Sequence, residues 1–162
     1  MRLAFFVNDV ATEIDEYTTT RLARAAAQRG HEVWYVGLGD VELGQRDGQL
    51  VARAHAAEFD KDDTLKSFMK RIKGRDAERI VMDHLDALFL RNESIDDLHE
   101  RSWASPLGVV FGQMLKARGV TVVNDPTSLM RATSKFYPGG VPREDPTTIT
   151  RDPRPGSNRA VR

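Results

Sequence analysis

Short apolar runs recur along the chain, and each of them ends abruptly in polar residues. Continuous apolar runs of this length are typical of strands that are buried on both faces, as in a parallel sheet. The first two runs flank Thr18–Arg29, a stretch rich in good helix formers that Gly30 is placed to end. The order strand, helix, strand predicts an α/β fold with an open, mainly parallel sheet and flanking helices. The runs are Leu3–Val7, Val33–Val36, Leu85–Leu90 and Val120–Val123.

The stretch after the second run departs from this alternation. Two short β-type segments, Asp40–Leu43 and Gln49–Arg53, flank a turn that carries Gly44 and Gly48. Two such segments around a glycine-bearing turn predict a β-hairpin inserted into the alternating pattern. A charged connector, residues 58–63, separates this hairpin from the next helical stretch.

Further helices are predicted from apolar spacing and from residues that favour helix ends. Apolar residues at helical spacing from Leu65 to Ile72 predict one helix, with Thr64 or Asp63 as its cap and Gly74 at its end. Ser105-Pro106 opens another, whose apolar stripe runs over residues 107–115 and which Gly119 ends. The same cap-and-proline pattern in Asn124-Asp125-Pro126 predicts a short third helix through Met130.

Polar side chains follow three of the predicted parallel strands. Ligands of open α/β sheets bind just beyond the carboxyl ends of the strands. Arg91 presents a planar fork of donors that matches a carboxylate, and Asn92 offers both a donor and an acceptor. These loops therefore predict a binding site for a small charged molecule, such as an amino acid or a short peptide. The polar residues are Asn8 and Asp9, then Arg91, Asn92 and Glu93, then Asn124 and Asp125.

Three threonines, Thr18–Thr20, stand at the start of the first predicted helix. Hydroxyl and backbone N–H groups at a helix start suit an anion. Simple N-capping of the helix explains the same residues. The sequence leaves both interpretations open.

Composition excludes several classes of protein. Lys+Arg and Asp+Glu are both 24, so the 162-residue chain has no basic excess with which to bind nucleic acid. It has no cysteine, which excludes disulfides and thiol catalysis. No apolar run is long enough to span a bilayer or to serve as a signal segment, so a cytoplasmic protein without a membrane partner is expected. The first glycine is Gly30, which argues against a dinucleotide-binding loop after the first strand.

No metal site and no catalytic group is predicted from motifs. The acidic clusters Glu13–Glu16 and Asp60–Asp63 are typical of solvated loops. The 4 histidines are scattered without metal-ligand spacing. No Gly-x-Ser-x-Gly elbow marks a nucleophile. The chain has the features of a binding half-site without its own machinery for chemistry.

Several motifs together carry a resemblance to a known family. They are Val7-Asn-Asp9, Arg29-Gly-His-Glu-Val33, Gly39-Asp-Val-Glu-Leu43, Val51-Ala-Arg-Ala-His55, Leu85-Asp-Ala-Leu-Phe-Leu-Arg-Asn92 and Gly119-Val-Thr-Val-Val-Asn-Asp-Pro-Thr-Ser-Leu129. With them the chain resembles the N-terminal domain of bacterial glutathione synthetase and related ATP-grasp ligases. The likeness implies a Rossmann-like pre-ATP-grasp domain. In Arg91-Asn-Glu-Ser-Ile95 the chain departs from the acidic residue and proline that usually follow the arginine in that family.

The resemblance also implies a function. The complete family enzyme activates the carboxylate of γ-glutamyl-cysteine as an acyl phosphate, which glycine then attacks. By resemblance, Arg91 and Asn92 are the first expected substrate contacts, and Asp9, Thr19 and Asn124 are weaker ones. ATP and magnesium bind later in chains of this family, so no cofactor is expected in this chain itself.

The resemblance divides the chain into two parts. Residues 1–137 are expected to form the substrate-binding domain, and residues 138–162 a tail or the start of an ATP-grasp domain. Five of the 7 prolines lie in this last part, which has little apolar periodicity. We expect the chain to be inactive alone and to work with an ATP-grasp domain in cis or in trans. A stand-alone, non-catalytic binding or interaction module is the alternative, and a homo-oligomer stays open.

Overall fold

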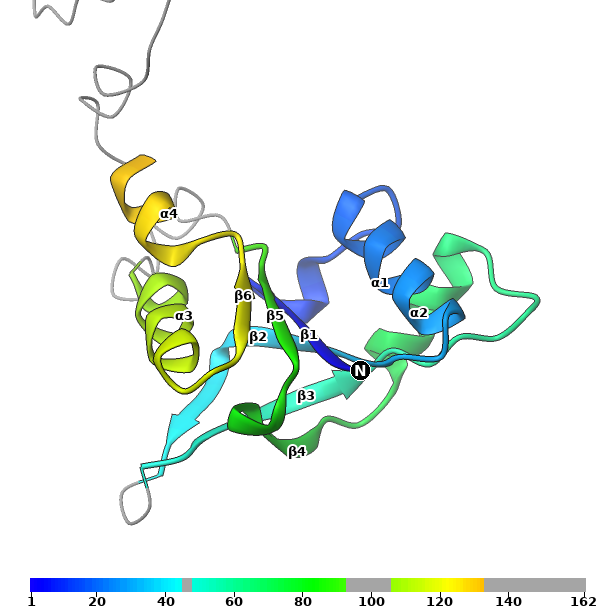
Figure 1. Ribbon diagram of the computed structural model, residues 1–162. Helices are drawn as coiled ribbons and strands as arrows, with labels where there is room; N and C mark the ends of the chain where they lie inside the picture. The colour runs from blue at the N-terminus through cyan, green and yellow to red at the C-terminus, as the bar shows by residue number, and fades with distance from the viewer. Residues whose placement is uncertain (45–47, 93–105, 133–162) are drawn as a thin grey trace, which may run out of the picture.

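The computed structural model of the protein describes residues 1–44, 48–92 and 106–132. They form a six-stranded sheet with the strand order β4-β3-β2-β1-β5-β6 and with helices on both faces (Figure 1). The neighbours β2, β1, β5 and β6 are parallel, which confirms the predicted α/β class. These strands are β1 (Arg2–Val7), β2 (Glu32–Leu43), β5 (Ala87–Leu90) and β6 (Thr121–Val123).

An antiparallel wing extends the sheet beyond β2 and makes it mixed. β3 (Leu50–Ala56) pairs with β2, and β4 (Glu78–Val81) pairs with β3. The predicted hairpin is present, but its first arm is no separate strand. It continues the second parallel strand as one long β2, whose register shifts between Val36 and Val41. β4 has no counterpart in the sequence prediction, because Ile80 is its one fully buried residue and no apolar pattern marks it.

Helices α1 (Thr18–Gln28) and α2 (Leu65–Gly74) cover one face of the sheet, and α3 (Leu107–Ala117) and α4 (Pro126–Ala132) lie on the other (Figure 1). Short 3-10 helices, η1 (Val10–Thr12) and η2 (Met82–His84), follow β1 and β4. The central strand β1 contributes alternate residues to the two cores. Phe5 packs on the side of α1 and α2, whereas Phe6 packs on the side of α3.

The helix ends follow the predicted grammar. Gly30 ends α1 and Gly119 follows α3, with φ angles of 80° and 95° that favour glycine. Thr64 caps α2, since its side chain accepts a hydrogen bond from the Ser67 N–H. The Asp125 carboxylate accepts a hydrogen bond of 2.9 Å from the Ser128 N–H and so caps α4. The predicted cap Ser105 lies outside the described residues.

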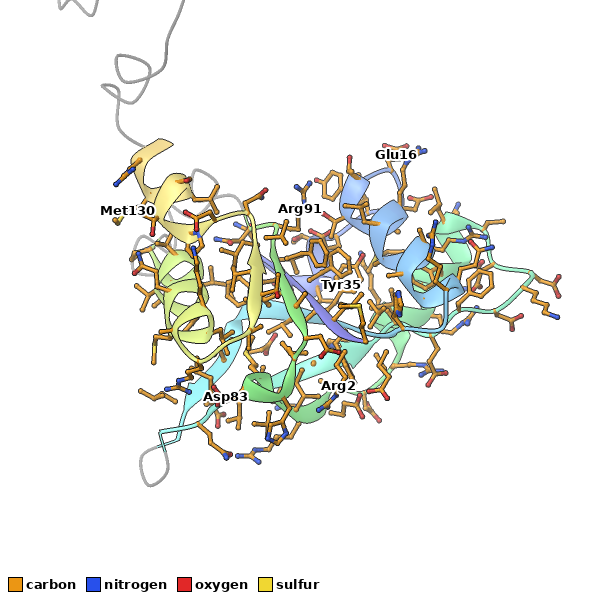
Figure 2. All side chains as sticks on the ribbon, viewed as in Figure 1. Arg2, Glu16, Tyr35, Asp83, Arg91 and Met130 are labelled. Atoms are coloured by element: carbon orange, nitrogen blue, oxygen red, sulfur yellow. The ribbon has the colours of Figure 1, made fainter. Side chains whose placement is uncertain are left out.

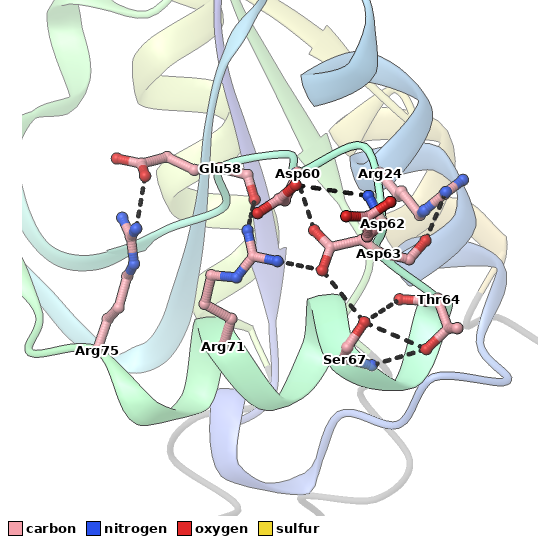
Figure 3. A network of polar contacts seen from close by, with 9 residues as sticks. All are labelled: Arg24, Glu58, Asp60, Asp62, Asp63, Thr64, Ser67, Arg71 and Arg75. Atoms are coloured by element: carbon pink, nitrogen blue, oxygen red, sulfur yellow. Dashed lines mark hydrogen bonds and ion pairs between the residues drawn. The ribbon is translucent and has the colours of Figure 1, made fainter.

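The connector before α2 corrects one sequence expectation, because Asp63 of the acidic cluster is buried rather than solvated. Its side chain is 3 % exposed and accepts hydrogen bonds from the Asp60 N–H at 2.9 Å and from Ser67 Oγ at 3.1 Å. Arg71 of α2 forms an ion pair with the same carboxylate (Figure 3). Arg24 of α1 donates to the Asp63 carbonyl at 2.7 Å. Asp63 therefore joins the connector to both helices of this face.

None of the helices in the described ranges is long and apolar enough to cross a membrane. The predicted tail, residues 138–162, lies outside the part of the chain that the structure describes, and so does the loop residue Glu93. The division of the chain at residue 137 stays a prediction.

Candidate functional site

The loops after β1, β5 and β6 lie at one edge of the sheet, because these three strands are parallel neighbours (Figure 1). Hydrogen bonds hold their ends together. The Arg91 N–H donates to the Phe6 carbonyl at 2.8 Å. The Asn124 side-chain amide donates to the Leu90 carbonyl at 3.1 Å. The polar residues predicted after these strands are thus gathered at this edge.

Arg91 and Thr19 are in direct contact. The Arg91 Nε–H donates to Thr19 Oγ1 at 3.1 Å, which links the end of β5 to the first turn of α1 (Figure 2 labels Arg91). Thr19 is buried, whereas Arg91 remains exposed. The contact holds the inner part of the guanidinium and leaves Arg91 accessible at the edge of the sheet.

The first turn of α1 has backbone donors that no side chain caps. Tyr17 is the N-cap residue, and its side chain makes no cap hydrogen bond. Thr20 Oγ1 donates to the Ile14 carbonyl at 2.7 Å, and Thr19 Oγ1 accepts from Arg91. The threonines therefore do not act as the N-cap, and the helix start keeps the N–H groups and positive dipole end that attract anions.

Two of the predicted site residues use their side chains within the fold. Asp9 caps η1, because its Oδ1 accepts a hydrogen bond of 2.8 Å from the Ala11 N–H. Asn124 spends a side-chain donor on the Leu90 carbonyl. Asn92 is half-buried, and its side chain lies close to Gly108 of α3. Of the five candidates, Arg91 and Thr19 are the pair brought into direct contact.

Glu13 is a residue of this edge that sequence reasoning missed. It belongs to an acidic cluster expected to be solvated, yet it is 8 % exposed, and its Oε2 is buried without a hydrogen-bond partner. Burial raises the pKa of Glu13 above its usual 4.5, while the charges of Arg91 and Lys73 act in the opposite direction. The carboxyl is thus within electrostatic reach of the exposed arginine.

Tyr35 of β2 lies close to this buried carboxyl (Figure 2 labels Tyr35). It is fully buried, and its hydroxyl has no partner at hydrogen-bonding geometry. Burial raises its pKa, the nearby Thr20 hydroxyl lowers it, and the charge of Glu13 raises it. No pattern in the sequence marked this tyrosine, because it stands inside an apolar strand.

The family of the prokaryotic glutathione synthetase N-terminal domain matches residues 1–130. The chain belongs to this family. No curated protein sequence matches the chain. The family match spans every described strand and nearly all of α4, including both Arg91 and Thr19.

Hollows of the glutathione synthetase N-terminal domain also occur away from this edge. One of about 420 Å³ lies at the amino end of β2, beside Val33, Trp34 and Phe59. Another of about 220 Å³ lies over β3 and β4, between Arg53 and Arg79. Neither is lined by a predicted site residue. Within the described ranges, no group of three or more histidine or acidic side chains is arranged to hold a metal ion.

Gly108→Ala is expected to displace the Asn92 side chain of this domain. A Cβ at position 108 would come within 2.6 Å of Asn92 Nδ2, and the free end of that side chain can move away. Stability should change by less than about 1 kcal/mol, because alanine is the better helix former. The Asn92 side-chain amide resonances should shift in NMR spectra. Gly74→Ala is the control, since a Cβ there meets nothing within 4 Å; unshifted Asn92 resonances would contradict the packing.

Proposed function

We propose that this chain is the substrate-binding part of a glutathione-synthetase-type ligase and that it binds the γ-glutamyl-cysteine dipeptide. The family match supports the kind of ligase. The observation that carries the proposal is the exposed Arg91 beside the uncapped first turn of α1. A guanidinium and helix N–H groups together suit a carboxylate, which the dipeptide offers.

In this proposal each residue has a definite part in binding. Arg91 takes a ligand carboxylate through the guanidinium nitrogens that Thr19 leaves available, and the α1 N–H groups add donors to the same anion. Asn92 recognises an amide or carbonyl group of the peptide. Asp9 and Asn124 shape the loops through the backbone contacts described above, and any contact they make with the ligand is secondary.

The chemical step would require more than these residues. Phosphoryl transfer depends on positioning and on neutralisation of charge by metal ions. We therefore propose that the described domain binds the dipeptide and that an ATP-grasp domain, in cis or in trans, supplies ATP and magnesium. The joining of γ-glutamyl-cysteine to glycine then takes place between the two domains, and the chain alone is inactive.

Isothermal titration of the chain tests this function. Injection of γ-glutamyl-cysteine should give saturable binding with one site per chain. Glycine alone and Mg-ATP alone should give no comparable signal. Tight binding of Mg-ATP would contradict the division of labour, and absence of dipeptide binding would contradict the proposed function.

A second candidate function is a stand-alone interaction module. It is favoured by exposed apolar side chains on the β6 side of the sheet: Val123 is 40 % exposed, Val110 of α3 is 41 % exposed and Met130 of α4 is 52 % exposed. Such a module would form a defined complex with a partner chain or with a second copy. Size-exclusion chromatography with light scattering, at several concentrations, separates the two functions.

A further inference from the structure

Glu13 occupies a costly position next to the proposed site. Its residue is 8 % exposed, and Oε2 has no hydrogen-bond partner. A buried carboxyl without a hydrogen bond lowers stability, and such groups are rare in folded proteins. The fold places it there firmly, because the neighbouring Ile14 carbonyl accepts a hydrogen bond of 2.7 Å from Thr20. Local structure alone gives no reason for an acid at this position.

Charged and titratable groups face Glu13 from three elements. Arg91 comes from the end of β5 and Lys73 from α2, and both favour the ionised carboxylate. Tyr35 comes from β2. Lys73 Nζ is held by the Ala11 carbonyl at 2.7 Å. On the loop of Glu13 itself, the other acids are Asp9, Asp15 and Glu16.

The two cations differ in what they can do for a ligand. Lys73 is bound to a backbone carbonyl of the loop, so its attraction to Glu13 serves to hold that loop. Arg91 is held through Nε by Thr19 and is otherwise exposed. An anion beneath an exposed arginine restricts the directions in which the guanidinium can point, because rotation away from it loses attraction.

We propose that Glu13 is a positioning residue for Arg91, whose carboxylate keeps the guanidinium against Thr19 so that its outer edge is ready for a ligand carboxylate. The part of this inference that concerns the ligand rests on the proposed function. Proteins commonly keep groups that reduce stability where a site requires them. Glu13 acts on the ligand through Arg91.

The stability of Glu13→Gln separates positioning from a purely structural role. The folded-state pKa of Glu13 is raised, so its contribution to stability is fully present below about pH 4.5 and is lost as the pH rises through the folded-state pKa. The glutamine variant lacks this loss. Relative to the wild type, Glu13→Gln should therefore gain stability between pH 4 and pH 8, measured as thermal midpoints across that range.

The decisive measurement is ligand-free. In the wild-type chain the Arg91 Nε–H resonance should move with pH as Glu13 ionises, whereas in Glu13→Gln it should not. Glu16→Gln is the matched control, because Glu16 is exposed on the same loop. An Arg91 resonance that behaves identically in the wild type and in Glu13→Gln would overturn the proposal.

Dipeptide titration completes the experiment. Glu13→Gln should weaken γ-glutamyl-cysteine binding about tenfold, and Glu13→Asp should recover part of it. Arg91→Ala combined with Glu13→Gln should bind no worse than Arg91→Ala alone, because the two residues act as one unit. Additive losses would overturn the proposal. If the wild type does not bind the dipeptide at all, the proposed function fails, whereas the Arg91 resonance still decides whether Glu13 positions the arginine.

Discussion

Asp63→Asn should lower the free energy of unfolding by about 3 kcal/mol, toward the lower end of the range for breaking a buried ion pair, since Arg71 keeps some solvent. The Asp63 side chain is 3 % exposed and that of Arg71 is 30 % exposed. The substitution removes the charge that Arg71, Ser67 and the Asp60 N–H all address (Figure 3). The thermal midpoint should fall by on the order of 10 °C.

Asp62→Asn is the matched control for this experiment. Asp62 is the exposed neighbour in the same acidic cluster, and its substitution should change stability by less than about 0.5 kcal/mol. Equal effects of the two substitutions would mean that the network around Asp63 contributes nothing specific. Chemical denaturation at neutral pH measures both.

The same network predicts a pH dependence. Burial by itself would raise the pKa of Asp63, but the Asp60 N–H, Ser67 and Arg71 together lower it below its usual 3.8. A lowered folded-state pKa means that the stabilisation is present above pH 3.8 and is lost as the pH falls through the folded-state value. The stability difference between the wild type and Asp63→Asn should therefore shrink on acidification below that point.

Arg91→Ala should weaken γ-glutamyl-cysteine binding by roughly 1.5–3 kcal/mol, which is about a tenfold to hundredfold loss of affinity. The reason is that an arginine–carboxylate contact is charge-assisted and a guanidinium can offer two parallel donors to it. Stability should change little, because Arg91 is exposed and its side chain has one hydrogen bond to Thr19. Isothermal titration and thermal unfolding of the same preparations give both quantities.

Arg91→Lys and Arg79→Ala make the experiment specific. Lysine keeps the charge but loses the planar fork, so it should recover only part of the affinity. Arg79 is an exposed arginine on β4, away from the parallel strands β1, β5 and β6, and its removal should leave binding unchanged. Wild-type affinity in Arg91→Ala would assign this arginine to structure.

Much of the fold was predictable because its signals are local. Leu3–Val7 and Leu85–Leu90 are apolar throughout, and helix α2 has its apolar spacing, its Thr64 cap and its Gly74 end within one short stretch. β4 and the long β2 were not predictable in the same way. The exposed Glu78 and Arg79 become part of a strand only because β3 offers them an edge with which to pair.

The site shows the same limit. The gathering of Arg91 and Asn124 at one edge follows from the parallel order of the strands, which the sequence pattern predicted. The burial of Glu13 and Asp63 did not follow from any pattern, because acidic clusters look alike in sequence whether or not a helix covers them. Whether a charge is solvated depends on α1, α2 and the sheet, which meet only in the folded chain.

The central place of β1 also affects how the protein is made. On one side β1 pairs with β2, which follows soon after, but on the other side Leu3 pairs with Ala87. At a synthesis rate of about 5–20 residues per second, that second partner appears roughly 4–17 seconds later. During this interval an apolar strand edge has no partner, and such edges recruit other chains. Ribosomal pausing before residue 87 should therefore favour aggregation, and faster passage through residues 65–90 should increase the yield of folded protein.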